Sequence, residues 1–141
     1  MPNAPSPLAG FTGGIEWIVD ASGCEPSRLR DASVLREICD EVVADLGLCV
    51  VGTPQLHAFP SPGGITALYL LSESHLACHT YPEFGFATFN LYCCRQRPRW
   101  NWENELRLRL GSARVSVRQV TREMVNDHLE GSSMLEEEAH S

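Results

Sequence analysis

Apolar and polar residues follow two different periods along the first half of the chain. Residues 14–20 are rich in β-branched and aromatic side chains, which predicts a strand. Across residues 26–47 the apolar positions recur about every 3.6 residues with charges between them, which predicts a single amphipathic helix that ends at Gly47. Two extended apolar stretches follow at residues 48–59 and 64–71, separated by a loop of prolines and glycines.

The second half of the chain shows the same two periods in the order strand, helix, strand. Residues 86–94 alternate between apolar and polar positions, residues 100–110 return to helical spacing, and residues 113–120 alternate strictly. The resulting order β-α-β-β-β-α-β is typical of an α+β domain. We therefore expect a two-layer α/β sandwich in which helices cover one face of an antiparallel sheet.

The two ends of the chain differ from this patterned region. Residues 1–13 are rich in proline, glycine, alanine and serine, which predicts a flexible N-terminal arm. Residues 126–141 include three consecutive glutamates, which predicts an acidic, flexible tail. The folded domain is accordingly expected to span residues 14–125.

The composition narrows the class of protein. Eleven basic against eighteen acidic residues give a net charge of -7, which argues against a nucleic-acid partner because phosphate binding needs a clustered positive field. No stretch is apolar enough to span a bilayer, and the first residues do not resemble a secretory signal. We expect a cytoplasmic protein without a membrane partner, whose six cysteines are reduced thiols.

Candidate chemistry is concentrated in residues 63–94. His75 and His79 would form a metal-binding pair on a helix, but the β-rich flanks favour an extended chain and two further ligands are missing, so no metal site is expected. Ser74, His79 and Cys94 could meet in a nucleophilic arrangement, although no Gly-x-Ser-x-Gly elbow surrounds the serine. Spacing alone favours the simpler interpretation, polar residues on a solvated sheet face.

The segment at residues 72–87, SESHLACHTYPEFGFA, resembles the processing motif of the short prokaryotic S-adenosylmethionine decarboxylase proenzymes. That family typically shows Glu-Ser-His followed by His-Thr-Trp-Pro-Glu-Tyr-Gly; here Tyr81 replaces the tryptophan and Phe84 the tyrosine. The similarity extends upstream through residues 57–59 and 62–66, and in all it covers about residues 14–122.

The resemblance implies a self-processing, pyruvoyl-dependent carboxy-lyase. The family cleaves a Glu-Ser bond, here Glu73–Ser74, and converts the serine into a covalent pyruvoyl group. The cut would divide the chain into a β chain, residues 1–73, and an α chain, residues 74–141. A pyruvoyl ketone forms a Schiff base with the substrate amine and serves as an electron sink during decarboxylation, much as PLP does.

Three further side chains take their expected roles from the resemblance. His79 aligns with the processing base, Thr66 with a serine that supports processing, and Cys94 with the acid that protonates the carbanion. Strand alternation places Cys94 on a polar face, whereas the neighbouring Cys93 falls on an apolar face with Ala87, Phe89 and Leu91. We therefore assign the proton donor to Cys94.

The expected substrate contacts are Glu83, which aligns with the glutamate that binds the ribose hydroxyls, and Phe59, which aligns with the aromatic residue that stacks on adenine. Three positions depart from the family pattern, where Glu16, Asn90 and Arg95 replace histidine, aspartate and glycine. Glu16 could pair with a basic substrate or be a surface charge.

The resemblance favours an S-adenosylmethionine decarboxylase that serves spermidine synthesis. Decarboxylation of arginine or ornithine is the alternative within the same chemistry. An inactive homologue that acts as a binding partner is the alternative of another class. By analogy with the family, the processed protomer is expected to pair into a homodimer.

Overall fold

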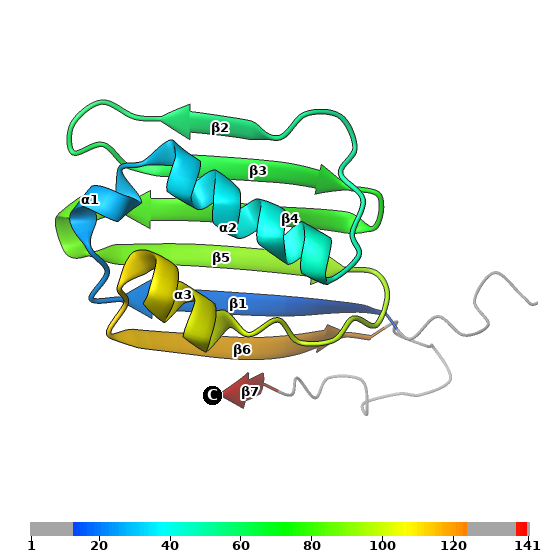
Figure 1. The fold of residues 1–141 in the computed structure, drawn as a ribbon. Coiled ribbons are helices and arrows are strands. Elements are labelled where there is room, and N and C mark those ends of the chain that lie inside the picture. Colours follow the sequence, from blue (N-terminus) through cyan, green and yellow to red (C-terminus); the bar gives the residue numbers. More distant parts are fainter. Residues whose placement is uncertain (1–12, 124–137, 141) are drawn as a thin grey trace, which may run out of the picture.

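The structure, a computed structural model, describes residues 13–123 and 138–140. Its elements are β1 (Gly14–Ser22), α1 (Pro26–Leu29), α2 (Ala32–Asp45), β2 (Gln55–Ala58), β3 (Ile65–Leu71), β4 (Ser74–Tyr81), the 3-10 turn η1 (Pro82–Phe84), β5 (Phe86–Cys93), α3 (Trp102–Leu110), β6 (Arg114–Arg122) and β7 (Glu138–His140). The strands form one antiparallel sheet in the order β2-β3-β4-β5-β1-β6-β7, and the helices lie against one of its faces (Figure 1). The predicted two-layer α+β sandwich is confirmed.

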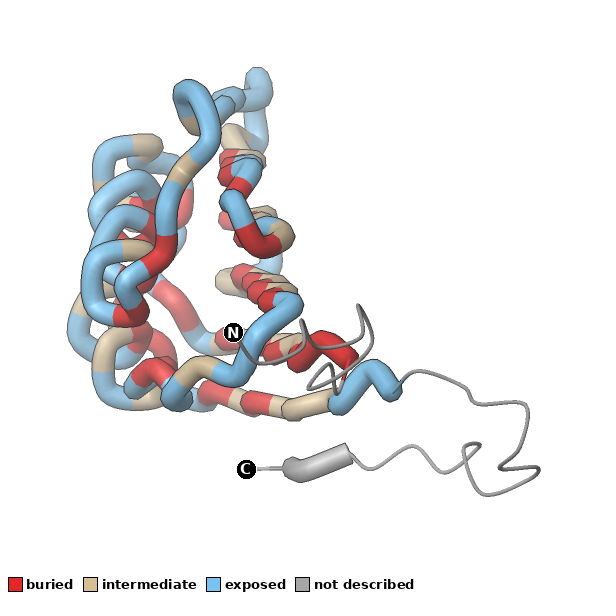
Figure 2. Tube along the Cα trace, turned by 90° about the vertical axis from the view of Figure 1, so that its right-hand side faces the viewer, coloured by how far each residue is buried: buried red, intermediate tan, exposed pale blue. Residues whose placement is uncertain are grey.

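The core lies between the sheet and the helices (Figure 2). Every second residue of the central strands is buried toward the helices, as in Trp17 and Val19 of β1 or Phe89 and Leu91 of β5. Leu35, Ile38 and Val42 of α2 and Trp102, Leu106 and Leu110 of α3 pack against them. The opposite face of the sheet carries no helix among the described residues.

The prediction of one continuous helix over residues 26–47 is wrong. The structure has the short helix α1 and the longer helix α2, with Arg30 and Asp31 between them. Asp31 is extended (φ -98°, ψ 105°), and its carboxylate accepts a hydrogen bond from the Ser33 amide, which makes it the N-cap of α2. Because Asp31 caps α2, the apolar repeat of residues 26–47 is divided between two helices.

The strand predictions need two corrections. Of residues 48–59, only Gln55–Ala58 form a strand, because Gly52 and Pro54 interrupt the preceding extended segment, which keeps one isolated bridge from Val50 to Leu71. The motif segment, which we expected only to be extended, forms a full strand of its own, β4, paired with β3 and β5. The actual order therefore contains one more strand between α2 and α3 than predicted.

The predicted N-terminal arm lies outside the described residues except for Gly13. Most of the predicted acidic tail also lies outside them. Within that tail, the backbone of Glu138–His140 pairs with β6 as the edge strand β7.

Candidate functional site

The predicted cleavage site, Glu73–Ser74, lies on the hairpin that joins β3 to β4. Leu71 pairs with Ser74, so Ser72 and Glu73 form a two-residue loop. Ser74 has a φ of 137°, and it is the one non-glycine residue with positive φ in the described part of the chain. A side chain rarely adopts this backbone conformation, and its cost is typically about 1–3 kcal/mol. The predicted cleavage site is therefore a point of backbone strain.

Hydrogen bonds from the backbone and the side chain hold Glu73 in place. Its carbonyl oxygen accepts a hydrogen bond from the Cys94 amide (2.9 Å), and the preceding Ser72 amide donates to the Cys49 carbonyl (2.9 Å). Its side chain is 8% exposed and receives two hydrogen bonds from Arg97, from Nε to Oε1 (2.7 Å) and from Nη2 to Oε2 (2.5 Å). The guanidinium lowers the pKa of the Glu73 carboxyl, which therefore stays ionised despite its burial.

The two adjacent cysteines occupy different environments, as the alternation predicted. Cys93 is the last residue of β5 and is buried on the helix face, where burial and the nearby Glu73 charge raise the pKa of its thiol to about 11. Cys94 follows the strand and is exposed. Its amide bonds to the carbonyl of Glu73, so Cys94 is the cysteine that borders the cleavage site from the solvent side.

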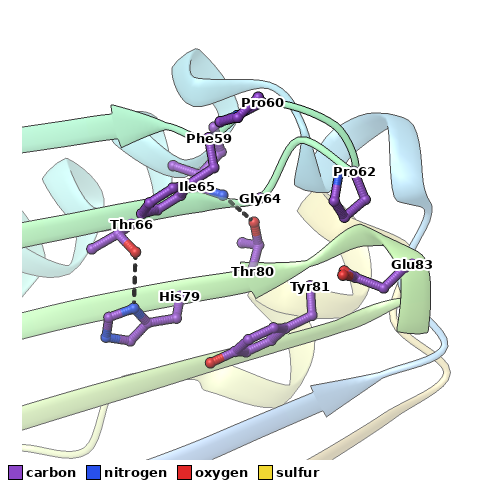
Figure 3. A pocket seen from close by; sticks show the side chains of 10 residues that line it. All are labelled: Phe59, Pro60, Pro62, Gly64, Ile65, Thr66, His79, Thr80, Tyr81 and Glu83. Atoms are coloured by element: carbon purple, nitrogen blue, oxygen red, sulfur yellow. Dashed lines mark hydrogen bonds between the residues drawn. The ribbon is translucent and has the colours of Figure 1, made fainter.

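A pocket of about 320 Å³ lies at the other end of β4 (Figure 3). Thr66, His79 and Tyr81 line its floor, and Phe59 and Glu83 lie on its two sides. Phe59 is half exposed, and Glu83 is exposed at the start of η1. Four of the residues predicted from the sequence thus line one pocket. Its size is within the usual range for small-molecule sites.

The pocket depends on a close approach between β3 and the end of β4. The Thr80 hydroxyl accepts a hydrogen bond from the Ile65 amide and donates one to the Leu29 carbonyl, both at 2.8 Å. A Cβ atom at Gly64 would lie 2.6 Å from the Thr80 carbonyl oxygen, so this position has no room for a side chain. These contacts fix the pocket wall to helix α1.

Thr66 and His79 are direct neighbours across β3 and β4. The Thr66 hydroxyl and His79 Nδ1 are 3.0 Å apart and share a hydrogen bond (Figure 3). The hydroxyl therefore orients the imidazole over the open face of the sheet. This is the arrangement in which a threonine can support a histidine base.

Ser74 and His79 do not meet within one chain. Five residues of extended strand separate them, which is about 16 Å at the usual rise per residue. A base must come within about 3 Å of the proton it removes, directly or through one water molecule. Of the three side chains expected to converge, only Ser74 and Cys94 lie at the same end of β4.

Two of the departures from the family pattern contact each other on the open face. Asn90 Nδ2 donates to Glu16 Oε2 (2.7 Å), and Asn90 Oδ1 is hydrogen bonded to His75 Nε2 (2.9 Å). Glu16 is also 3.4 Å from Arg122. Glu16 therefore already has partners within the chain and is not an isolated surface charge. The third departure, Arg95, contributes positive charge near Glu73.

Sequence reasoning missed Arg97. The only sequence signal was the run Arg95, Arg97 and Arg99 after β5, which does not reveal which carboxylate each arginine bonds. Among the residues described here, no group of three or more histidine, cysteine, aspartate or glutamate side chains is placed to hold a metal ion. Within the same residues, no helix is long and apolar enough to cross a membrane.

The sequence of this domain matches a known protein family and several of its members. The family model for S-adenosylmethionine decarboxylase matches residues 15–123. The S-adenosylmethionine decarboxylase proenzyme of Symbiobacterium thermophilum is 45% identical over 87 residues, 62% of this chain and 64% of the relative. The proenzyme of Pyrobaculum islandicum is 42% identical over 74 residues, 51% of this chain and 57% of the relative. The chain thus matches somewhat less than two thirds of the length of these relatives.

A solved structure agrees with these sequence matches. The crystal structure of the adenosylmethionine decarboxylase from Aquifex aeolicus VF5 superposes with a TM-score of 0.69 at 25% identity, and the match covers 84% of this chain and 97% of that one. Because the family model covers more than half of the chain, including the strained hairpin and the pocket, the resemblance is confirmed. The chain belongs to the S-adenosylmethionine decarboxylase family.

Proposed function

We propose that the protein is a self-processing decarboxylase that makes a pyruvoyl group from Ser74 and acts on S-adenosylmethionine. The observation that carries the proposal is the positive φ of Ser74 in the loop where the family motif has its Glu-Ser bond. Strain stored at one peptide bond favours the reaction that relieves it. The names of the relatives support the substrate.

The bonds that break and form in the cleavage belong to Glu73 and Ser74 of one chain. The Ser74 hydroxyl attacks the Glu73 carbonyl carbon, and the C–N bond then breaks to give an ester with a free Ser74 amine. Removal of the Ser74 α-proton forms a Cα=Cβ double bond and expels Glu73 as a carboxylate. One water molecule hydrolyses the resulting dehydroalanine, which releases ammonia and leaves the pyruvoyl group. The Cys94 amide, bonded to the Glu73 carbonyl oxygen, can stabilise the negative charge in the first step.

The surroundings of Ser74 fit this group. The residue that would carry it begins β4, is partly exposed and pairs with Leu71 and Cys93, with the exposed Cys94 beside it. When present, the pyruvoyl group supplies the electron sink for decarboxylation. In our proposal Cys94 delivers the proton that replaces carbon dioxide, and Phe59 and Glu83 bind the adenosyl part by stacking and by hydrogen bonds to the ribose. The product would supply aminopropyl groups for spermidine synthesis.

We further propose that two chains share each active site. Because Ser74 and His79 lie at opposite ends of β4, a second copy must bring its histidine to the serine. Pairing over the open face would place Ser74 beside His79 of the partner subunit. Large apolar side chains on this face, Leu68 and Leu70 among them, are 46% and 61% exposed, which supports its burial against a second copy.

Intact-mass analysis and a denaturing gel test the cleavage. We expect fragments of residues 1–73 and 74–141, the second with a blocked N-terminus that resists Edman degradation. A free N-terminal serine would mean simple hydrolysis and would contradict the pyruvoyl assignment. A single uncut chain would support the inactive homologue instead.

Two measurements test the substrate and the shared site. Carbon dioxide release from S-adenosylmethionine, arginine and ornithine should be seen with the first alone, and borohydride reduction should trap that substrate on the 74–141 fragment. Coexpression of Ser74→Ala and His79→Ala chains should restore cleavage of the His79→Ala chain, because the Ser74→Ala chain donates the missing histidine. If the His79→Ala chain stayed uncut in the mixed dimer, the shared site would be wrong.

A further inference from the structure

The ion pair between Arg97 and Glu73 is attached to the predicted cleavage site and has no role in the chemistry described so far. Arg97 lies in the connection between β5 and α3, whereas Glu73 lies in the β3–β4 loop. Arg97 Nη1 also donates a hydrogen bond to the Leu46 carbonyl at the end of α2 (3.3 Å). One guanidinium thus fastens the loop to two other parts of the fold.

Self-cleavage would add negative charge to Glu73, whose side chain is already a carboxylate. The first step develops negative charge on the Glu73 carbonyl oxygen, and the last leaves a new α-carboxylate on the same residue. The Glu73 side chain is a buried carboxylate beside both groups. An unpaired negative charge at this position would repel each of them, and low exposure would leave little solvent to screen it.

Arg97 is placed to remove this repulsion. Two of its nitrogens bond the two carboxylate oxygens, so the positive guanidinium offsets the negative charge of the Glu73 side chain. The same contacts fix the rotamer of Glu73, and with it the carbonyl that accepts the Cys94 amide. After cleavage, the guanidinium remains beside the new C-terminus of the β chain.

We propose that Arg97 is a positioning residue for self-cleavage, which neutralises the Glu73 carboxylate and holds the Glu73 carbonyl on the Cys94 amide while Ser74 attacks. This inference rests on the proposed self-processing function. The proposal makes a specific prediction: removing the charge of Glu73 should restore part of the cleavage rate that is lost when Arg97 is replaced.

The test is the first-order rate of conversion of newly translated full-length protein into its two fragments, followed on a denaturing gel. Arg97→Met should slow conversion by at least about tenfold. The double variant Glu73→Gln/Arg97→Met should convert faster than Arg97→Met, because no unpaired carboxylate remains. Arg97→Lys should lie between wild type and Arg97→Met.

A matched control comes from Arg99, two residues further along the same connection, which bonds Glu103 of α3 at 2.9 Å in a similar side-chain pair. Arg99→Met should convert at the wild-type rate. Thermal unfolding of each variant in a Ser74→Ala background, which stays uncut, separates an effect on the rate from an effect on stability. Failure of the wild type itself to cleave would contradict the proposed function. Equal rates for wild type and Arg97→Met, or a double variant as slow as Arg97→Met, would overturn the role of Arg97 alone.

Discussion

At the Ser74 end of β4 the backbone is strained, and both the carbonyl and the side chain of Glu73 are bonded within the chain. At the His79 end, regular antiparallel pairing presents side chains to an open pocket. The two ends belong to the same strand and the same motif. Their different environments teach that the motif has two structurally distinct ends; in our proposal one supplies the bond to be cut and the other supplies the base and the substrate pocket.

The largest expected effect is at the strained end. Ser74→Ala should abolish cleavage and activity, because no hydroxyl remains to attack Glu73. The matched control is Ser72→Ala, which changes an exposed serine in the same loop and should cleave normally. Intact-mass analysis distinguishes the two. Cleavage in the Ser74→Ala variant would show that the strained bond is not the one that is cut.

The next prediction tests the role of His79, which lines the pocket at the other end of β4. His79→Ala should stop processing at the ester, because the α-proton of Ser74 has no base, and hydroxylamine should then split the protein between residues 73 and 74. Thr66→Val removes only the hydrogen bond to the imidazole and should slow processing about two- to twelve-fold. An equal effect of both variants would mean that the pocket end acts through its structure and not through the base.

The cysteine pair tests the assignment of the proton donor. Cys94→Ala should still process, but its turnover should fall by about 10²–10⁴-fold, the usual range for a positioned general acid. Cys93→Ala should lower the melting temperature, because it removes a buried thiol, and should leave turnover nearly unchanged. The reverse pattern in steady-state kinetics would show that the buried thiol is the acid.

Glu83→Gln separates substrate binding from processing. Loss of hydrogen bonds to a charged acceptor should raise KM for S-adenosylmethionine about ten- to a hundredfold, with self-cleavage unchanged. Glu37→Gln, an exposed change on α2, provides the control. If kcat fell and KM stayed constant, Glu83 would not be a binding residue for the ground-state substrate.

The smallest effect concerns acid stability. Arg97 lowers the pKa of Glu73 from its ordinary value of 4.5, so the folded state binds that proton less readily than the unfolded chain. The stabilisation is therefore present above about pH 4.5 and is lost as the pH falls through the folded pKa. In a Ser74→Ala background, urea unfolding should show this loss, and Glu73→Gln should remove that part of the pH dependence.

The elements of the fold that depend on local periodicity were predictable. The alternation of residues 86–94 correctly separated Cys93 from Cys94, and the helical spacing of residues 100–110 correctly predicted α3. The break at Asp31 was missed because one capping hydrogen bond interrupts an otherwise regular period. Strand β4 was missed as a separate element because its hairpin loop contains no glycine or asparagine, and Ser74 itself adopts the positive φ.

The site was predictable only where a motif names its residues. Phe59, Thr66, His79 and Glu83 were identified from the resemblance, and the structure places them in one pocket. The pairing of Arg97 with Glu73 joins residues 24 positions apart through a loop, and no period of the sequence encodes it. The separation of Ser74 from His79 follows from strand register, which became clear only once β4 was known as a strand.

The strand order gives the proposed self-cleavage a lasting consequence for folding. A cut between residues 73 and 74 leaves β2, β3 and β1 on one fragment and β4, β5 and β6 on the other, yet β1 lies between β5 and β6. The two fragments are therefore interleaved in a single sheet and cannot separate unless it unfolds. Once separated, they would have to find each other again, so refolding would depend on concentration. In our proposal the chain must therefore fold before it is cut, and the cut would make unfolding hard to reverse.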